Sequence, residues 1–141
     1  MEEARRRNVA VIARVPLASG LLTGKMTSAS VFAPDDHRNF NRHGEAFDKG
    51  ETFAGVPYDV ALEAVERIRP LVPEGVSMAA LALRWILMAE AVSVVIPGAR
   101  TPEQARANAA ADALPVLSGE TMDALRGIYD ELVAPHVHQV W

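Results

Sequence analysis

The stretch Ile96-Pro97-Gly98-Ala99-Arg100-Thr101-Pro102-Glu103-Gln104 decides the fold, because it predicts the end of a strand followed at once by the start of a helix. The run Val92–Ile96 before it is rich in β-branched residues, which is typical of a strand buried on both faces. A proline and a glycine then end the strand. Thr101 suits the N-cap of the following helix, Pro102 its first position, and Gln104 completes a capping box. This order of elements indicates an α/β protein.

The turn that opens this helix is the strongest candidate for a binding site. The first N–H groups of a helix and its partial positive charge suit a phosphate group, and Arg100 lies just outside that terminus. Thr101, Gln104 and Asn108 follow one another at helical spacing, so they form one polar stripe that suits a nucleotide. The alternative interpretation is a capped surface helix with an exposed arginine, and spacing alone leaves both interpretations open.

A second turn of small residues follows an earlier apolar run. Residues 9–13 predict another buried strand, and the turn after it reads Arg14-Val15-Pro16-Leu17-Ala18-Ser19-Gly20-Leu21-Leu22-Thr23-Gly24-Lys25. This turn differs from a Walker A loop, because Gly20 is one residue too close to the Gly-Lys pair and Met26 replaces the hydroxyl residue. What remains is a small-residue loop at the carboxyl end of a strand, where backbone amides can approach a ligand closely.

A long irregular segment separates this turn from the first predicted helix. Residues 27–57 hold four phenylalanines at no regular period, and His37 and His43 lie there among mixed charges. Loops of that length are usually functional or disordered, and the phenylalanines argue against disorder. A segment that gates a substrate and a solvated loop that pairs with itself are both open interpretations.

Helices dominate the rest of the chain. Apolar residues at helical spacing predict a helix over residues 58–68 and another over residues 78–89, with Ser77 as its N-cap. The second of these carries one charged residue, so we expect it to be buried nearly all round. A last helix begins near Ser118 and is expected to end at Pro135. Two strands cannot build a sheet that buries both faces of each, so the sequence looks like part of a larger, mostly helical α/β protein.

Composition limits the classes of function. The chain has 141 residues, half of them apolar, a formal net charge of −4 and no cysteine. An acidic chain without a basic face makes nucleic acid a poor partner, and the lack of cysteine excludes disulfides, thiolate metal sites and thiol nucleophiles. No apolar run approaches the roughly 18 residues of a membrane span, and the charged start is unlike a secretory signal. We therefore expect a soluble, cytoplasmic protein with no metal site.

These segments together resemble the carboxyl-terminal portion of the aldo/keto reductase family. Residues 10–17 and 20–25 are similar to the family's seventh barrel strand and the loop after it. Leu81-Ala82-Leu83-Arg84-Trp85 is similar to the seventh helix, and the stretch from Val94 to Asn108 to the eighth strand and its coenzyme-binding turn. The resemblance implies the C-terminal part of a (β/α)8 TIM barrel, about strands 7 and 8 with their helices. Residues 1–141 would then form one partial domain of an incomplete barrel.

The resemblance also implies half of an NADPH site. Family members bind NADPH in extended form and reduce carbonyls to alcohols. Along the coenzyme diphosphate, the resemblance implies Pro16, Leu17, Ser19 and Gly20. Around the adenosine 2′-phosphate it implies Gly98, Ala99, Arg100 and Gln104, with Asn108 near the adenine. Arg14 stands where many members place a flat side chain beneath the nicotinamide, and a guanidinium can also stack on a ring.

The family's catalytic Asp, Tyr, Lys and His belong to earlier strands, which no segment of this sequence resembles. We therefore expect no catalytic residue here, and we interpret Tyr58 and Tyr129 as core residues. A small carbonyl substrate would bind only in the complete barrel. Two alternatives are a non-catalytic, coenzyme-binding regulatory subunit, like the barrel relatives that accompany potassium channels, and a free-standing nucleotide-binding module. The exposed edges of the two predicted strands also lead us to expect a homo-oligomer.

Overall fold

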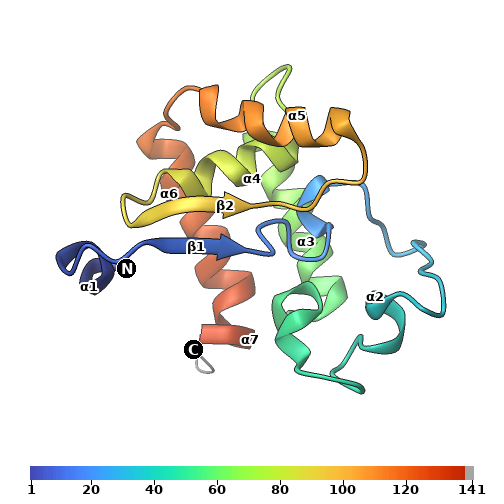
Figure 1. The fold of residues 1–141 in the computed structure, drawn as a ribbon. Helices are drawn as coiled ribbons and strands as arrows, with labels where there is room; N and C mark the ends of the chain where they lie inside the picture. Colours follow the sequence, from blue (N-terminus) through green and yellow to red (C-terminus); the bar gives the residue numbers. More distant parts are fainter. Residues whose placement is uncertain (139–141) are drawn as a thin grey trace.

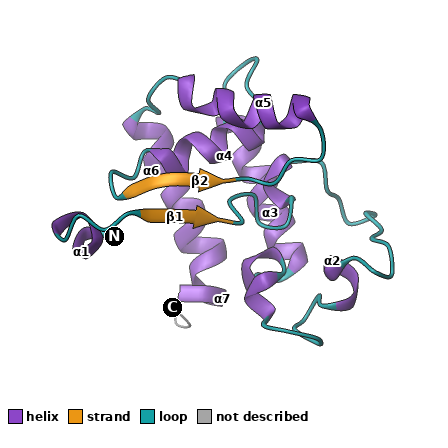
Figure 2. Ribbon diagram, viewed as in Figure 1, coloured by secondary structure: helices purple, strands orange, loops and turns teal. Residues whose placement is uncertain are grey.

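A computed structural model describes residues 1–138 of the chain. Within them the structure has two strands and seven α-helices, so regular structure is mostly helical, as predicted. The strands are β1 (Val11–Arg14) and β2 (Val92–Ile96), and the helices are α1 (Glu2–Arg6), α2 (His37–Phe40), α3 (Tyr58–Ile68), α4 (Met78–Leu87), α5 (Pro102–Ala110), α6 (Gly119–Ile128) and α7 (Ala134–Val137). Figures 1 and 2 show the strands side by side, with α3, α4 and α6 behind them and α5 beyond β2.

β1 and β2 pair in parallel, which the strand–helix–strand order predicts. Their register joins Val11 to Val92 and Arg14 to Ile96. Since parallel strands end at the same edge of a sheet, the turns after β1 and β2 leave that edge together, at the arrowheads in Figure 1. The pairing therefore brings together two turns that lie far apart in the sequence.

One face of this sheet is open, so the prediction that both strands are buried on both faces is wrong. Ile12, Val94 and Ile96 are 61%, 43% and 54% exposed, and all three lie on the side away from the helices. The reason is that residues 1–138 supply helices for one face of the sheet and no further layer for the other. β1 also begins later than predicted, at Val11, and leaves Val9 exposed before it.

The two predicted central helices form, with one difference in burial. α3 has the expected bounds, and Arg67 pairs with Glu63 at 2.6 Å along its surface. The Ser77 hydroxyl caps α4 by accepting the N–H of Ala80 at 3.1 Å. α4 is not buried all round as expected, because the large Trp85 side chain is 42% exposed.

The C-terminal helix runs further than predicted. α6 passes through a π-helical turn, Tyr129–Val133, directly into α7. Pro135 does not end it, since this proline lies in the first turn of α7, where a helix requires no N–H donor. Val137 is buried in the core, so the prediction of a free tail after Pro135 is wrong for residues 136–138. The rest of the predicted tail, residues 139–141, lies outside the described residues.

The long segment 27–57 is ordered around a buried asparagine rather than irregular throughout. It contains α2 and two 3-10 turns, Lys49–Glu51 and Phe53–Gly55. The Asn41 side chain is fully buried, and its amide group donates to the Thr52 hydroxyl at 3.2 Å. Its side-chain oxygen accepts the backbone N–H groups of Ala46 and Phe47 at 2.9 and 2.8 Å. This one side chain therefore forms hydrogen bonds with backbone groups that have no partner within the short helical elements.

The core lies between the helices and the turn after β1. Its members come from the turn after β1, the long segment, α3, α4 and α7: Leu21, Phe53, Val56, Ala61, Val65, Met78 and Val137. No helix among residues 1–138 has both the length and the apolar content required to cross a membrane.

Candidate functional site

The turn after β2 is stiffened by hydrogen bonds between near neighbours. The Thr101 hydroxyl accepts the N–H of Gln104 at 3.2 Å, which confirms the predicted N-cap. The Gln104 side-chain oxygen accepts the N–H of Arg100 at 2.7 Å, so the capping box reaches back one residue further than the usual motif. The Asn108 amide group donates to the carbonyl of Gly98 at 3.2 Å. The predicted polar stripe thus holds the turn in one shape.

Several donors of this turn remain available to a ligand. The Arg100 side chain is exposed and has no ion-pair or hydrogen-bond partner within residues 1–138, and neither do the backbone N–H groups of Ala99 and Thr101. A methyl group placed on Gly98 would meet nothing within 4 Å, so the backbone there is open to close approach. A cavity of about 450 Å³ lies beside the turn, between β2, α4 and α5, and Ala99 and Asn108 line it. Free amides and an unpaired guanidinium at a helix start suit an anion.

The turn after β1 has a strained backbone. Val15, Ala18 and Ser19 have φ angles of 50°, 47° and 57°, in the left-handed region that side-chain-bearing residues rarely adopt. Each such residue costs about 1–3 kcal/mol, and residues of this kind cluster at ligand sites. Gly20 follows with a φ of 90°. The N–H groups of Leu17 and Ser19 have no acceptor in the described part of the chain.

Ser19 joins this turn to the long segment 27–57. Its hydroxyl lies 3.3 Å from Nε2 of His37, accepts the N–H of Phe53 at 3.3 Å, and contacts the carbonyl of Glu51 at 3.4 Å. Its own carbonyl accepts a hydrogen bond from Arg38 at 3.3 Å. Local hydrogen bonds, such as that from the N–H of Ala18 to the carbonyl of Val15 at 3.0 Å, also shape the β1 turn, and Ser19 adds contacts to residues far along the chain.

Arginines and aromatic rings hold the segment over the turn. The Arg38 guanidinium lies 4.6 Å from the centroid of the Phe32 ring, and Arg42 lies 4.6 Å from that of Tyr58. Arg38 also pairs with Asp36 at 2.5 Å, and this hydrogen-bonded pair lowers the pKa of Asp36 from 3.8 to about 2. The Tyr58 hydroxyl donates to the carbonyl of Thr27 at 2.9 Å, so this tyrosine serves packing and loop closure.

Arg14 and Glu51 form an ion pair that sequence reasoning missed. Two nitrogens of the Arg14 guanidinium donate to the two Glu51 oxygens at 2.5 and 3.2 Å. The pair lowers the pKa of Glu51, first through the hydrogen bond and then through the charge of Arg14. No local signal could have revealed it, since the partners belong to different elements and no motif contains both.

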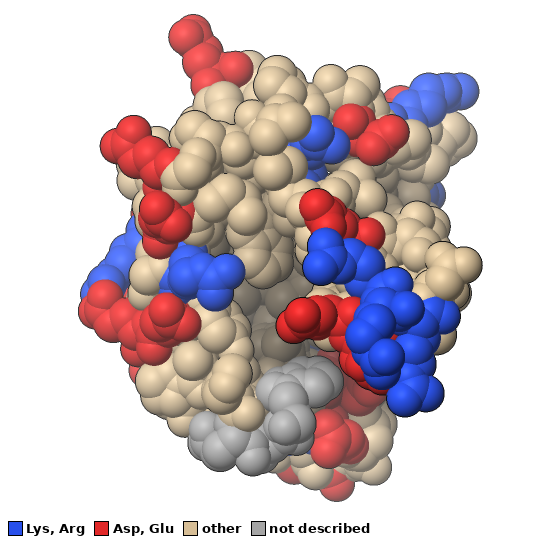
Figure 3. Space-filling model, turned by 90° about the vertical axis from the view of Figure 1, so that its left-hand side faces the viewer, with Lys and Arg blue, Asp and Glu red and all other residues tan. Residues whose placement is uncertain are grey.

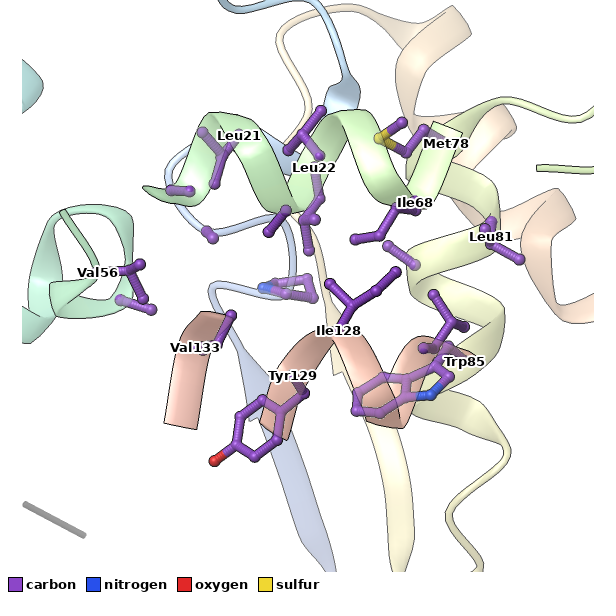
Figure 4. Close-up of a pocket in the computed structure, with 18 of the residues that line it drawn as sticks. Leu21, Leu22, Val56, Ile68, Met78, Leu81, Trp85, Ile128, Tyr129 and Val133 are labelled. Carbon is purple, nitrogen blue, oxygen red and sulfur yellow. The ribbon is translucent and has the colours of Figure 1, made fainter. Parts of the chain in front are cut away.

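A second cavity lies between the helices and the turn after β1. It has about 350 Å³ and is lined by apolar side chains of α3, α4, α6 and the loop after β1, among them Leu22, Ile68, Trp85 and Ile128 (Figure 4). Its lining includes Pro16, the one predicted coenzyme residue that faces it, and no charged residue. Nothing in that lining could neutralise a phosphate. On the face of the molecule in Figure 3, acidic and basic side chains surround an uncharged hollow, and the largest group of basic side chains lies to its right beside acidic ones.

The structure thus brings the predicted coenzyme residues to one edge of the sheet in two groups. The group after β1 is Pro16, Leu17, Ser19 and Gly20, and the group after β2 is Gly98, Ala99, Arg100, Gln104 and Asn108. Residues 1–138 contain no cluster of His, Asp or Glu that could hold a metal ion.

Two parallel strands joined through helices, with a turn after each strand at the same edge of the sheet, are the arrangement of an α/β protein. The chain belongs to the aldo/keto reductase family, whose family model matches residues 1–130. It is 32% identical over 120 residues to a probable voltage-gated potassium channel subunit beta of Oryza sativa subsp. japonica, a match that covers 80% of this chain and 33% of that protein. It is also 38% identical over 93 residues to the aldo-keto reductase YhdN of Bacillus subtilis (strain 168), covering 64% of this chain and 25% of that one.

Solved structures agree on the fold. The glycerol dehydrogenase AKR11B4 from Gluconobacter oxydans superposes with a TM-score of 0.72 at 28% identity, covering 94% of this chain and 37% of that one. The holo form of aldo-keto reductase AKR11C1 from Bacillus halodurans, at 21% identity and a TM-score of 0.58, shares the fold over 90% of this chain and 36% of its own. The chain therefore spans about a third of the length of its relatives.

Proposed function

We propose that this chain carries the C-terminal half of an NADPH site, in a barrel that when complete reduces carbonyls to alcohols. In this proposal β1 and β2 are the seventh and eighth strands of the barrel, and their open face is its interior. The observation that carries the proposal is the unpaired Arg100 beside free backbone amides at the start of α5. Membership of the aldo/keto reductase family supports the choice of a nicotinamide coenzyme.

Each turn has its own task in this proposal. The Arg100 guanidinium and the first N–H groups of α5 bind the 2′-phosphate, and Gln104 orients the turn through the N–H of Arg100. Asn108 lies beside the adenine at the cavity between β2, α4 and α5. The N–H groups of Leu17 and Ser19 bind the diphosphate. NADPH supplies the hydride, while this chain holds and orients it.

In this proposal no residue of this chain protonates the carbonyl oxygen of the substrate. A carbonyl that receives a hydride needs a proton donor within hydrogen-bond reach. We assign that donor, and the groups that tune it, to the parts of the barrel that precede β1. We therefore assign no catalytic residue among residues 1–141.

The test is a titration of Arg100→Ala with NADPH and NADH by calorimetry. A charge-assisted hydrogen bond contributes roughly 1.5–3 kcal/mol, so the variant should bind NADPH about tenfold to a hundredfold more weakly and NADH nearly unchanged. Arg106→Ala is the matched control, because Arg106 lies on α5, just after the turn that holds Arg100, and pairs with Glu103 at 3.5 Å. Equal weakening of both coenzymes, or no loss for NADPH, would contradict the proposal.

A second candidate function is a regulatory subunit that binds coenzyme without turning over substrate. The similarity to probable potassium channel subunits beta of Oryza sativa subsp. japonica and Arabidopsis thaliana, at 32% and 30% identity, favours it. Single-turnover hydride transfer to an aldehyde by the complete barrel separates the two candidates, since a regulatory subunit would retain bound NADPH without oxidising it at a useful rate.

A further inference from the structure

By the resemblance to the family, Arg14 would lie beneath the nicotinamide ring as a flat platform. We propose that Glu51, by pairing with the Arg14 guanidinium, makes this platform charge-neutral and so allows the site to accept the positively charged oxidised coenzyme. Glu51 is then a positioning residue that sets the ratio of the dissociation constants of NADP⁺ and NADPH. The inference rests on the proposed function, because that function fixes where the coenzyme lies.

The geometry of the pair suits a platform. Arg14 is the last residue of β1, on the open face of the sheet, and its side chain is 66% exposed. Glu51 binds the guanidinium along one edge, through two nitrogens at 2.5 and 3.2 Å. Pairing along the edge leaves the two planar faces of the guanidinium available, and a guanidinium stacks on flat rings through those faces.

Glu51 is fixed in place by its surroundings. It ends the 3-10 turn Lys49–Glu51, which the Asp48 side chain caps by accepting the N–H of Gly50 at 2.8 Å. The carbonyl of Glu51 contacts the Ser19 hydroxyl at 3.4 Å, and the next residue, Thr52, is buried against Asn41. The carboxylate therefore holds the plane of the Arg14 guanidinium from the long segment.

The direction in which the coenzyme would lie along the sheet edge brings its nicotinamide ring to the Arg14–Glu51 pair. With the 2′-phosphate at the start of α5 and the diphosphate over Leu17 and Ser19, an extended dinucleotide continues along the edge from β2 toward β1. Arg14 pairs with Ile96 across that edge and is the first charged side chain on the β1 side. The ring at that end is the nicotinamide.

Charge explains why the platform needs Glu51. The nicotinamide ring is positively charged in NADP⁺ and neutral in NADPH, so an unpaired guanidinium would repel the oxidised ring alone. The Glu51 carboxylate cancels the charge of Arg14. The nearby Arg38 is already paired with Asp36, so that second pair adds little net charge.

The experiment measures the dissociation constants of NADP⁺ and NADPH for the full chain and its variants by calorimetry, at low salt. Glu51→Gln should raise the ratio of the NADP⁺ constant to the NADPH constant about three- to tenfold, and added salt should shrink that effect. Arg14→Gln should lower the ratio, since it leaves the carboxylate unpaired near the oxidised ring. The double variant should restore the ratio of the wild type. Glu66→Gln is the control, because Glu66 pairs with Arg69 at 2.7 Å on α3.

The outcomes separate this inference from the proposed function. Opposite shifts in the two single variants support the platform, because a merely structural loss would weaken both coenzymes alike. An unchanged ratio, or equal weakening, overturns the platform. Titration with 2′,5′-ADP, which has the adenosine 2′-phosphate and no nicotinamide, tests the proposed function alone. If 2′,5′-ADP binds and the ratio does not move, the proposed function stands and the platform falls; if neither 2′,5′-ADP nor the coenzymes bind, both fall.

Discussion

The turns after β1 and β2 leave the same edge of the sheet but are built in opposite ways. The β2 turn is held by residues at most ten positions apart, such as Asn108 and Gly98. The β1 turn is held by Ser19 and Arg14, whose partners lie 18 to 37 positions away in the long segment. A turn like that after β2 can be predicted from its own sequence, and it forms whenever the helix that follows it forms. The turn after β1 also has local hydrogen bonds, such as that from the N–H of Gly20 to the carbonyl of Leu17 at 3.0 Å, but its contacts through Ser19 and Arg14 form only when a distant segment has folded over it.

The largest effect is expected when the long segment that contacts the β1 turn is destabilised. Asn41→Ala should lower the free energy of unfolding by about 2–4 kcal/mol, because it removes the hydrogen bonds that this fully buried side chain makes with Thr52, Ala46 and Phe47 and leaves its space empty. Urea denaturation followed by tryptophan fluorescence measures the loss. Asn39→Ala is the control, since Asn39 is exposed and donates only to the carbonyls of Phe32 and Ala33. A loss no greater than that of the control would mean that the segment is not a support.

A smaller effect is expected where the segment pairs with itself. Asp36→Asn should lower the free energy of unfolding by about 1–2 kcal/mol at pH 7, because it removes the ion pair with Arg38. The hydrogen bond from Arg38 lowers the pKa of Asp36 from 3.8 to about 2, so the folded state keeps the carboxylate ionised in acid. The stabilisation is therefore complete above about pH 4 and is lost as pH falls from about 4 to 2.

The measurement is urea denaturation of the wild type and Asp36→Asn at several values of pH. The difference in free energy between the two proteins should shrink from pH 5 toward pH 2. Comparing the two proteins at each pH removes the contribution of the other carboxylates whose pKa is also lowered, among them Glu3, Glu45 and Glu66. A difference that stays constant over this range would show that the charge of Asp36 does not stabilise the fold.

The smallest effect is expected at the locally built turn. Thr101→Ala removes one capping hydrogen bond from α5 and should cost about 1 kcal/mol. Thr101→Ser keeps the hydroxyl and serves as the control. Hydrogen exchange of α5 should rise in the alanine variant while exchange in residues 27–57 stays unchanged. Faster exchange in both regions would show that the two turns are coupled, and the comparison between them would fail.

The sequence predicts the parts of this molecule that depend on neighbours along the chain. The N-caps Ser77 and Thr101, the bounds of β2 and α3, and the parallel order of the strands all follow from spacing and residue type. The open sheet face could not be predicted, because β-branched residues look the same whether or not a further layer covers them. The Arg14–Glu51 pair and the Asn41 network could not be predicted either, since each joins elements whose approach only the folded chain determines.

The residues of the candidate site also fall into those that the sequence predicts and those that only the folded chain brings together. Gly98, Arg100 and Gln104 could be grouped from their motif alone, and they meet in the structure. His37 and Glu51 could not be assigned to the β1 turn, because the long segment has no period that says where it folds back. Aromatic residues without a period were the one available sign that this segment packs against something.

The π-helical turn Tyr129–Val133 decides where along the C-terminal helix a change of length is tolerated. A π turn holds one residue more than an α-helix would use for the same hydrogen-bonding step. Each residue of an α-helix turns the chain by about 100°. Because the π turn already accommodates that extra residue, deleting one residue here would let α6 continue as a regular helix with α7 still in phase and Val137 still in the core. A deletion or insertion in α6 itself has no such relief, and it would rotate α7 by about 100° and carry Val137 out of the core.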